Sequence, residues 1–253
     1  MAAVVARCFD SLIERLAHVR DTQDAAIDAA AASCADSIGK GKLVFTFGTG
    51  HGVLPALETF PRTGTVVGFR PIVESTMISS HRVWGDMGAR QYRFIHAVEG
   101  YGLAILRSHR LDTDDAMILF SHSGVNAVIL DIATECKARG LTVIAVTSLP
   151  HSSAMPSRHS SGTRLFEVAD VTIDTGVPIA DAALRIEGLE HPVGANSTSI
   201  AIAHAIVAAT AEKLVARGVA PMVMVNPNTA DREQANRQND ANYEALWRRL
   251  AAR

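Results

Sequence analysis

The alternation of apolar and polar positions is most regular between Asp115 and Ser148. Met117 to Phe120 is a short apolar run that ends abruptly in a polar Ser-His-Ser-Gly sequence. Apolar residues then recur at positions 128, 129, 132, 133 and 136, which is the period of an amphipathic helix, and a β-branched run follows at 143–146. The spacing predicts a strand, a helix and a strand joined by tight turns, which is a right-handed βαβ unit with parallel strands.

Similar patterns extend on both sides of this unit. Apolar runs at 43–47, 65–69 and 171–174 predict three further strands of the same kind. Helical spacing covers 9–37 at the start of the chain and 199–216, which is apolar almost all round. The segment 236–250 has a single apolar face, and the Ser- and Pro-rich stretch 149–162 predicts a long loop. These elements alternate as in an α/β protein with a parallel sheet.

Hydroxyl side chains gather where two of the predicted strands end. Ser121 and Ser123 follow the first strand of the central unit, and Thr147 and Ser148 follow the second. Ligands of an open parallel sheet bind at the carboxyl ends of its strands, beside helix N-termini whose first N–H groups are free. Hydroxyls, free N–H groups and the positive end of a helix dipole together favour an anion such as phosphate. The alternative is that Ser123 or Asn126 only caps the helix.

The same residues resemble a known family. A Ser-x-Ser-Gly sequence after a buried strand, followed by Lys-x-x-Gly-x-x-Val-Ile-Ala-x-Thr-Ser, resembles the SIS (sugar isomerase) domain. The Ser- and His-rich loop after Ser148 resembles one uncharacterised branch of that family. Two positions depart from the family pattern: Asn126 stands where threonine is usual, and His122 stands where a small or amide side chain is usual. The resemblance covers roughly residues 5 to 230.

The resemblance implies a three-layer α/β/α sandwich around a five-stranded parallel sheet, the flavodoxin-like SIS fold, which binds phosphosugars. Within it we expect an N-terminal helical segment at 1–40, the SIS domain at 41–220 and a C-terminal extension with a helix at 221–253. The family likeness and the apolar helices also lead us to expect a homodimer or homotetramer.

A glycine-rich loop follows the first predicted strand. It reads Gly48, Thr49, Gly50, His51 and Gly52. A dinucleotide site would need a later third glycine and an acidic residue after the second strand, so this loop disfavours NAD. It resembles instead the SIS pattern Gly-x-Gly-x-Ser, with Gly52 where the serine usually stands. We therefore count the residues 48–51 among the candidate phosphate-binding residues, together with Ser121, His122, Ser123, Asn126, Thr147 and Ser148.

Two residues are candidates for proton transfer. Glu58 falls on the helix after the glycine-rich loop, where related isomerases carry a glutamate that reaches an active site at a subunit boundary; the alternative is a surface pair with Arg62. His204 lies on the apolar helix 199–216, where related isomerases carry a catalytic histidine; the alternative is a hydrogen-bonded core group. Secondary candidates are Glu74, His81, His151 and Glu187. His151 and His159 form a weak ligand set, so we expect no metal.

Composition narrows the remaining possibilities. The chain has 253 residues, 48% hydrophobic and 20% charged, with a formal net charge of −2. That balance and the sparse aromatic residues give no reason to expect nucleic acid. Three widely spaced cysteines and an N-terminus without a signal-peptide pattern favour the cytoplasm. No stretch reaches the ~18 apolar residues of a membrane span, so we expect no membrane partner.

The sequence thus favours an enzyme that converts an aldose phosphate into a ketose phosphate through an enediol. This chemistry needs neither a redox cofactor nor a metal, and we expect none. Two alternatives remain open because a fold does not choose a function. One is a phosphosugar-binding sensor or scaffold without catalysis, and the other is a lyase that acts as an etherase on an N-acetylmuramic acid phosphate.

Overall fold

The computed structural model describes residues 3–78, 88–179, 181–195, 198–229 and 231–253. His81, one of the secondary candidates, lies outside the described residues.

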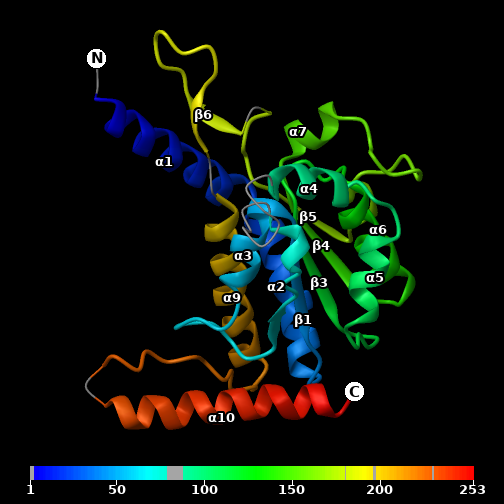
Figure 1. Cartoon of the computed structure of the whole chain (residues 1–253). Helices are drawn as coiled ribbons and strands as arrows, with labels where there is room; N and C mark the ends of the chain where they lie inside the picture. The colour runs from blue at the N-terminus through cyan, green and yellow to red at the C-terminus, as the bar shows by residue number, and fades with distance from the viewer. Residues whose placement is uncertain (1–2, 79–87, 180, 196–197, 230) are drawn as a thin grey trace.

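Five parallel strands form the centre of the molecule (Figure 1). They are β1 (Val44–Gly48), β2 (Phe69–Pro71), β3 (Ala116–Phe120), β4 (Thr142–Thr147) and β5 (Val171–Asp174). Their order in the sheet is β2-β1-β3-β4-β5, the flavodoxin-like order that the resemblance implied. β1 and β3 are buried along their whole length, because helices cover both faces of the sheet. The five-stranded parallel sheet is therefore confirmed.

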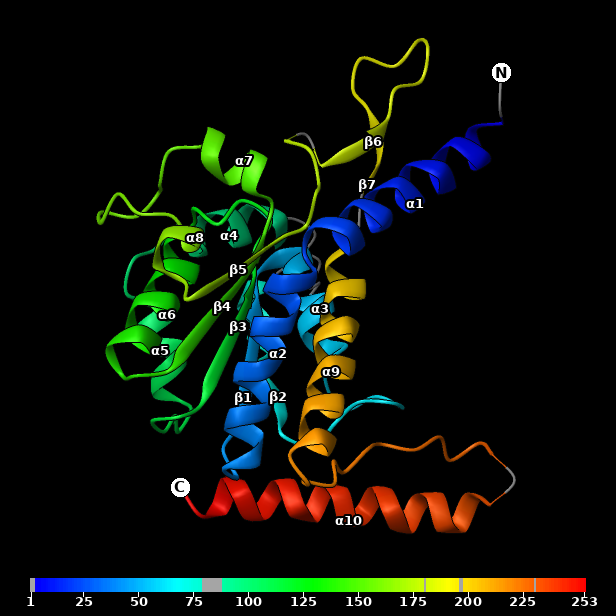
Figure 2. The same cartoon turned by 180° about the vertical axis from the view of Figure 1, so that it is seen from behind.

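Helices form a layer on each face of the sheet, as Figures 1 and 2 show from opposite sides. One layer contains α2 (Asp24–Gly39), α3 (Val53–Leu57) and α9 (Thr198–Ala216), of which α2 and α9 pack closely together. The other contains α4 (Gly88–Ile95), α5 (Tyr101–Arg107), α6 (Ala127–Ala138) and α8 (Leu165–Val168). The three-layer α/β/α sandwich is confirmed by this arrangement.

Two long helices extend beyond the sandwich. α1 (Val4–Thr22) projects from the carboxyl edge of the sheet, and α10 (Arg232–Ala251) lies across the opposite end of the molecule (Figure 2). A small antiparallel hairpin of β6 (Ala182–Leu184) and β7 (Val193–Ala195) stands beside α1.

Three local predictions differ from the structure. The predicted loop 149–162 begins with a short helix, α7 (Leu149–Ala154), because Ser148 caps it by accepting a hydrogen bond from the N–H of His151 at 3.2 Å. The segment before β2 is not part of the sheet, since Val66 forms an isolated antiparallel bridge with Val223. The less regular segment 92–109 predicts a single helix at 98–106; in the structure α5 begins at Tyr101, and α4 precedes it.

The hydropathy of α9 is higher than expected, because the sequence predicted no stretch apolar enough to span a membrane. By length and composition alone, this helix in the described chain could cross a membrane. It packs against α1, α2 and α3, and its apolar side chains Ile202, Ala203, Ile206 and Val207 are buried in the core. One face of α9 thus belongs to the core, while Ala201, Ala205 and Ala208 on its other face are exposed.

Candidate functional site

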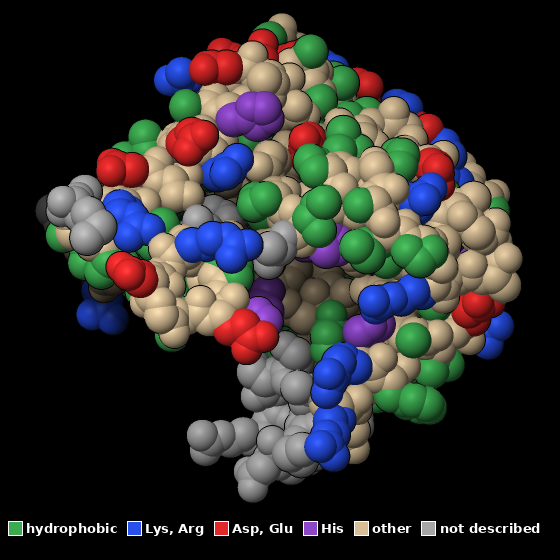
Figure 3. Space-filling model, turned by 90° about the horizontal axis from the view of Figure 1, so that it is seen from above, with side chains coloured by type: hydrophobic (Ala, Val, Ile, Leu, Met, Phe, Trp, Pro, Cys, Tyr) green, Lys and Arg blue, Asp and Glu red, His purple; other side chains and the backbone are tan. Residues whose placement is uncertain are grey.

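A cavity of about 360 Å³ opens at the carboxyl ends of β1 and β3. In the sheet, β1 has β2 on one side and β3 on the other. The connections that follow β1 and β3 therefore run toward opposite edges of the sheet, which leaves a crevice between the carboxyl ends of these two strands. Figure 3 shows the hollow from above with histidine side chains at its rim. Its lining consists of His51, Gly52, Leu54, Pro55, Phe120, Ser121, His122, Val146, Thr175, Val177, Asp181, Ala195 and Ser199.

The glycine-rich loop after β1 packs its backbone directly against β3. A Cβ on Gly52 would lie 2.4 Å from the carbonyl oxygen of Phe120, and a Cβ on Gly48 would lie 2.1 Å from that of Gly52. No side chain fits at either position, so this loop approaches the neighbouring strand end as only glycine allows. Of the four candidates in the loop, His51 lines the cavity, while Gly48, Thr49 and Gly50 do not.

The loop after β3 brings hydroxyls to the N-terminus of α6. Ser121 lines the cavity, and its Oγ accepts a hydrogen bond from the N–H of Gly124 at 3.1 Å. Ser123 is half-buried beside it. Asn126 is the N-cap residue that precedes α6, yet its side chain accepts no hydrogen bond from the helix N–H groups. The first turn of α6 therefore lacks a side-chain cap, although the main-chain carbonyl of His96 accepts the N–H of Val128 at 3.3 Å. A helix N-terminus without a side-chain cap suits an anion.

Thr147 and Ser148 point into the protein. Both are fully buried. The Thr147 hydroxyl donates to the carbonyl of His122 at 3.2 Å, and the Ser148 hydroxyl donates to the carbonyl of Val177 at 2.6 Å. These two hydroxyls hold the neighbouring loops in place, and neither belongs to the cavity lining.

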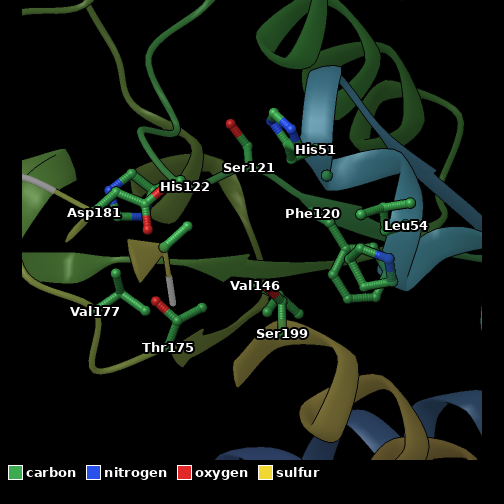
Figure 4. A pocket seen from close by; sticks show the side chains of 13 residues that line it. His51, Leu54, Phe120, Ser121, His122, Val146, Thr175, Val177, Asp181 and Ser199 are labelled. Atoms are coloured by element: carbon green, nitrogen blue, oxygen red, sulfur yellow. The ribbon is translucent and has the colours of Figure 1, made fainter. Parts of the chain in front are cut away.

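His122 and His151 form a pair at the cavity wall. The Nε2 of His122 lies 3.2 Å from the Nδ1 of His151, which lies 2.5 Å from the carbonyl oxygen of Ile179. A carbonyl only accepts, so the Nδ1 of His151 carries the proton of that contact. Burial lowers the pKa of His122, the charge of Asp181 opposes this shift, and His151 adds to it. His122 is therefore a neutral imidazole near pH 7, facing the cavity beside Asp181 (Figure 4).

Glu58 and His204 lie together although 146 residues separate them. The Oε2 of Glu58 is 3.2 Å from the Nε2 of His204 and 2.6 Å from the Nη1 of Arg62. The helix pair α3 and α9 brings them together on a partly exposed face. Neither residue lines the cavity, whose nearest lining residues on these helices are Leu54, Pro55 and Ser199.

None of the three secondary candidates that the structure describes lines the cavity. Glu74 caps a short helical turn by accepting hydrogen bonds from Thr76, and Glu187 is exposed in the turn between β6 and β7. His151 contacts the cavity only through His122. In the described part of the chain, no group of three or more His, Cys, Asp or Glu side chains could hold a metal ion.

Sequence reasoning missed three polar residues of the lining. Thr175 directly follows β5, so the rule of strand ends could have found it; its Oγ1 is buried and unpartnered within the described structure. Asp181 and Ser199 reach the cavity from the segment after β5 and from the start of α9. Figure 4 shows Thr175 and Ser199 across the cavity from His51 and Ser121.

A doubly wound parallel sheet with a cavity at its switch point defines a class of α/β proteins that bind small molecules. Within that class, this chain belongs to the SIS domain family, whose sequence profile matches residues 8–148. It is 32% identical over 245 residues to a UPF0309 protein of Brucella anthropi, covering 96% of this chain and 97% of that one. It is also 32% identical over 215 residues to a UPF0309 protein of Halalkalibacterium halodurans, covering 84% and 86%.

Solved structures agree on the fold. A phosphoheptose isomerase from Neisseria gonorrhoeae superimposes with a TM-score of 0.51 at 16% sequence identity, covering 82% of this chain and 97% of that one. At this identity the likeness concerns the fold alone. The chain is thus a SIS domain protein that shares its fold with that isomerase.

Proposed function

We propose that this protein isomerises a sugar phosphate between its aldose and ketose forms. The observation that carries the proposal is the cavity at the β1/β3 switch point, with the Ser121 hydroxyl on its wall and the uncapped N-terminus of α6 next to it. A volume of about 360 Å³ is within the range of small-molecule sites. The phosphate would bind at the N-terminus of α6 with Ser121 and Ser123, and the sugar would extend into the cavity.

The polar groups of the lining suit sugar hydroxyls. Thr175 has a buried Oγ1 without a partner in the described structure, and Asp181 and Ser199 add an acceptor and a further hydroxyl. A hydroxylated ligand would satisfy the Thr175 group, whose burial without a hydrogen bond otherwise costs free energy.

The reaction moves one proton between two neighbouring carbons and one between their oxygens. A base removes the proton from the carbon next to the carbonyl, the electrons of that C–H bond form the C=C bond of an enediol, and the carbonyl oxygen takes up a proton. The base then gives its proton to the former carbonyl carbon while the neighbouring hydroxyl loses its proton and becomes the new carbonyl. Glu58 is the candidate base: Arg62 and His204 hold its carboxylate, and the His204 imidazole would carry the proton between the two oxygens. His122 is a neutral imidazole on the cavity wall itself and can accept a proton there.

We further propose that the protein works as a homo-oligomer. The outer face of α9 presents the small residues Ala201, Ala205 and Ala208 to solvent, next to the exposed Leu54 and Leu57 of α3. The Glu58–His204 pair lies on this same face, so a second copy packed there would enclose it.

A second candidate function has an observation in its favour. Glu58 and His204, the two candidates for proton transfer, do not line the cavity. The same cavity would therefore also serve a protein that binds a phosphosugar and senses it without catalysis.

Exchange in heavy water separates these functions. The protein is incubated with a panel of aldose and ketose phosphates in D₂O, and deuterium next to the carbonyl is followed by NMR. For an isomerase we expect incorporation that falls at least 100-fold in Glu58→Gln.

The matched control is Glu233→Gln, which also removes a carboxylate paired with an arginine four residues on, but on α10. Binding without exchange would replace the isomerase by the sensor, and release of lactate from N-acetylmuramic acid 6-phosphate would replace it by the etherase.

A further inference from the structure

The cavity lining contains no fixed positive charge. None of its described residues is lysine or arginine. A phosphate monoester carries close to two negative charges at pH 7, and hydroxyls and helix N–H groups supply only partial charges. Phosphate sites are commonly completed by a guanidinium, which binds the oxygens through two parallel N–H groups.

One arginine is fixed at the N-terminus of α6. Arg158, in the loop after α7, donates its backbone N–H to the carbonyl of Val125 at 2.9 Å. Its Nη1 donates to the Oδ1 of Asn126 at 3.2 Å. No carboxylate of the described chain forms an ion pair with Arg158, so its charge is not neutralised there. Asn126 is buried, at 8% exposed, and its side chain does not cap α6. It instead holds the Arg158 guanidinium beside the N-terminus of that helix.

A buried and unpartnered imidazole lies at the same helix end. His96 is 5% exposed, and its Nδ1 has no hydrogen-bond partner within the described structure. The carbonyl of His96 accepts the N–H of Val128 in the first turn of α6 at 3.3 Å, which places the residue beside that turn. Burial lowers the pKa of His96, and the charge of Arg158 lowers it further.

The glycine-rich loop after β1 meets this cluster through Tyr92. The ring of Tyr92 packs edge-on against His96, with 4.6 Å between ring centroids, and its hydroxyl lies against the backbone of Gly50. Burial raises the pKa of Tyr92, while a hydrogen bond with Thr49 and the charge of Arg158 oppose the rise. Through these contacts the loop after α7 and the glycine-rich loop both meet the N-terminus of α6, Arg158 through Asn126 and Gly50 through Tyr92 and His96.

We propose that Arg158 is the cationic ligand of the substrate phosphate and that Asn126 positions it. This inference rests on the proposed function, because it assigns a residue of the same phosphate site. Asn126 stands where the SIS pattern usually has threonine. With asparagine at this position, the phosphate loses the contact that a threonine hydroxyl would make. The Asn126 amide instead orients the guanidinium of Arg158, which contributes a full positive charge. Through Arg158, the loop after α7 thereby makes the site selective for a dianionic group such as a phosphate monoester.

Direct binding of phosphate tests this assignment. The probes are inorganic phosphate and ribose 5-phosphate, titrated calorimetrically into the full-length protein at fixed ionic strength. A charge-assisted hydrogen bond to phosphate implies binding about 10- to 100-fold weaker in Arg158→Gln. Arg158→Lys should recover part of the loss, since it restores the charge without the bidentate geometry. Asn126→Ala should weaken binding several-fold with Arg158 intact, as a positioning residue would.

Arg164→Gln is the matched control. Arg164 follows in the same loop and carries the same charge, but it is ion-paired with Glu167. We expect it to bind both probes like the wild type. Equal losses in Arg158→Gln and Arg164→Gln, or no loss in Arg158→Gln, would overturn the inference and leave the proposed function intact. A wild-type protein that binds neither probe would overturn the proposed function and this inference together.

Discussion

Gly52 occupies the position at which the family pattern carries serine. A hydroxymethyl group there would need space that the carbonyl of Phe120 already fills, at 2.4 Å from the Cβ position. The departure from the family pattern thus has a steric reason: the loop after β1 lies closer to β3 than a side chain permits. The loop contributes main-chain groups and His51 to the cavity wall, and no serine hydroxyl.

Restoring the family serine should therefore damage the protein. We expect Gly52→Ser to lower the free energy of unfolding by about 1–3 kcal/mol, because the added atoms push two backbone segments apart. Chemical denaturation measures the change. Gly39→Ala is the control, since its Cβ would meet only Leu214 at 3.9 Å and alanine favours the helix. A Gly52→Ser protein as stable as the wild type would show that the loop can move away from β3 at no cost.

Residue types at strand ends predicted the edge of the sheet at which the cavity lies, but not which side chains face it. Ser121 and His122 line the cavity, whereas Thr147 and Ser148 turn inward to main-chain carbonyls. A strand end allows either direction, and the choice depends on acceptors from remote segments such as Val177. Sequence spacing carries no information about those acceptors.

At the scale of the element, α10 is attached to the sandwich through a buried ion pair. Both Asp115 oxygens accept from the guanidinium of Arg253 at 2.7 Å, and the two side chains are 0% and 3% exposed. The same carboxylate accepts the N–H of Leu43 before β1 and that of Asp112 before β3. One side chain thus connects two strand starts and the end of the last helix.

Removing this carboxylate should destabilise the protein strongly. We expect Asp115→Ala to lower the free energy of unfolding by about 3–5 kcal/mol, since it leaves the buried Arg253 charge without a partner. Asp28→Ala is the control: Asp28 is 63% exposed in its ion pair with Lys213, and we expect a loss of at most about 1 kcal/mol. Urea denaturation of both variants checks the difference. A loss below about 1 kcal/mol for Asp115→Ala would mean that Arg253 reaches water at little cost.

Helices and strands with strong periodicity were predicted well, and short ones were not. The central unit forms β3, α6 and β4 as expected, because its pattern matches both burial and local propensity. The helices α4 and α7 escaped prediction: each is eight residues or fewer, and α7 begins in a segment rich in Ser and Pro. Their helical state depends on packing and on the Ser148 cap rather than on an apolar period.

At the scale of the whole molecule, apolar surface remains exposed on two helices. α1 presents Val5, Phe9 and Ile13, each more than 60% exposed and spaced four residues apart, and α9 presents a row of alanines. Solvent-facing apolar stripes of this kind mark association surfaces. Both stripes agree with the homo-oligomer proposed above.

A charge placed on the α9 face should disrupt that assembly. We expect the wild type to have a mass in solution that is a multiple of 26.9 kDa, and Ala205→Arg to lower it, because a buried unpaired guanidinium is unfavourable in an interface. Light scattering coupled to size exclusion measures both. Ala241→Arg, on the exposed face of α10, is the control and should keep the wild-type mass. A monomeric wild type would contradict the proposal.

The sequence alone determined the α/β class, the central βαβ unit, the hydroxyl-rich strand ends and the resemblance to SIS proteins, because all of these depend on residues close in the chain. Tertiary structure decided the rest. It paired Glu58 with His204 across 146 residues, turned Thr147 and Ser148 inward, and brought Arg158 to the N-terminus of α6 through Asn126. Those contacts depend on how layers pack and loops cross the edge of the sheet, and local spacing does not encode the distance between segments that meet only after folding.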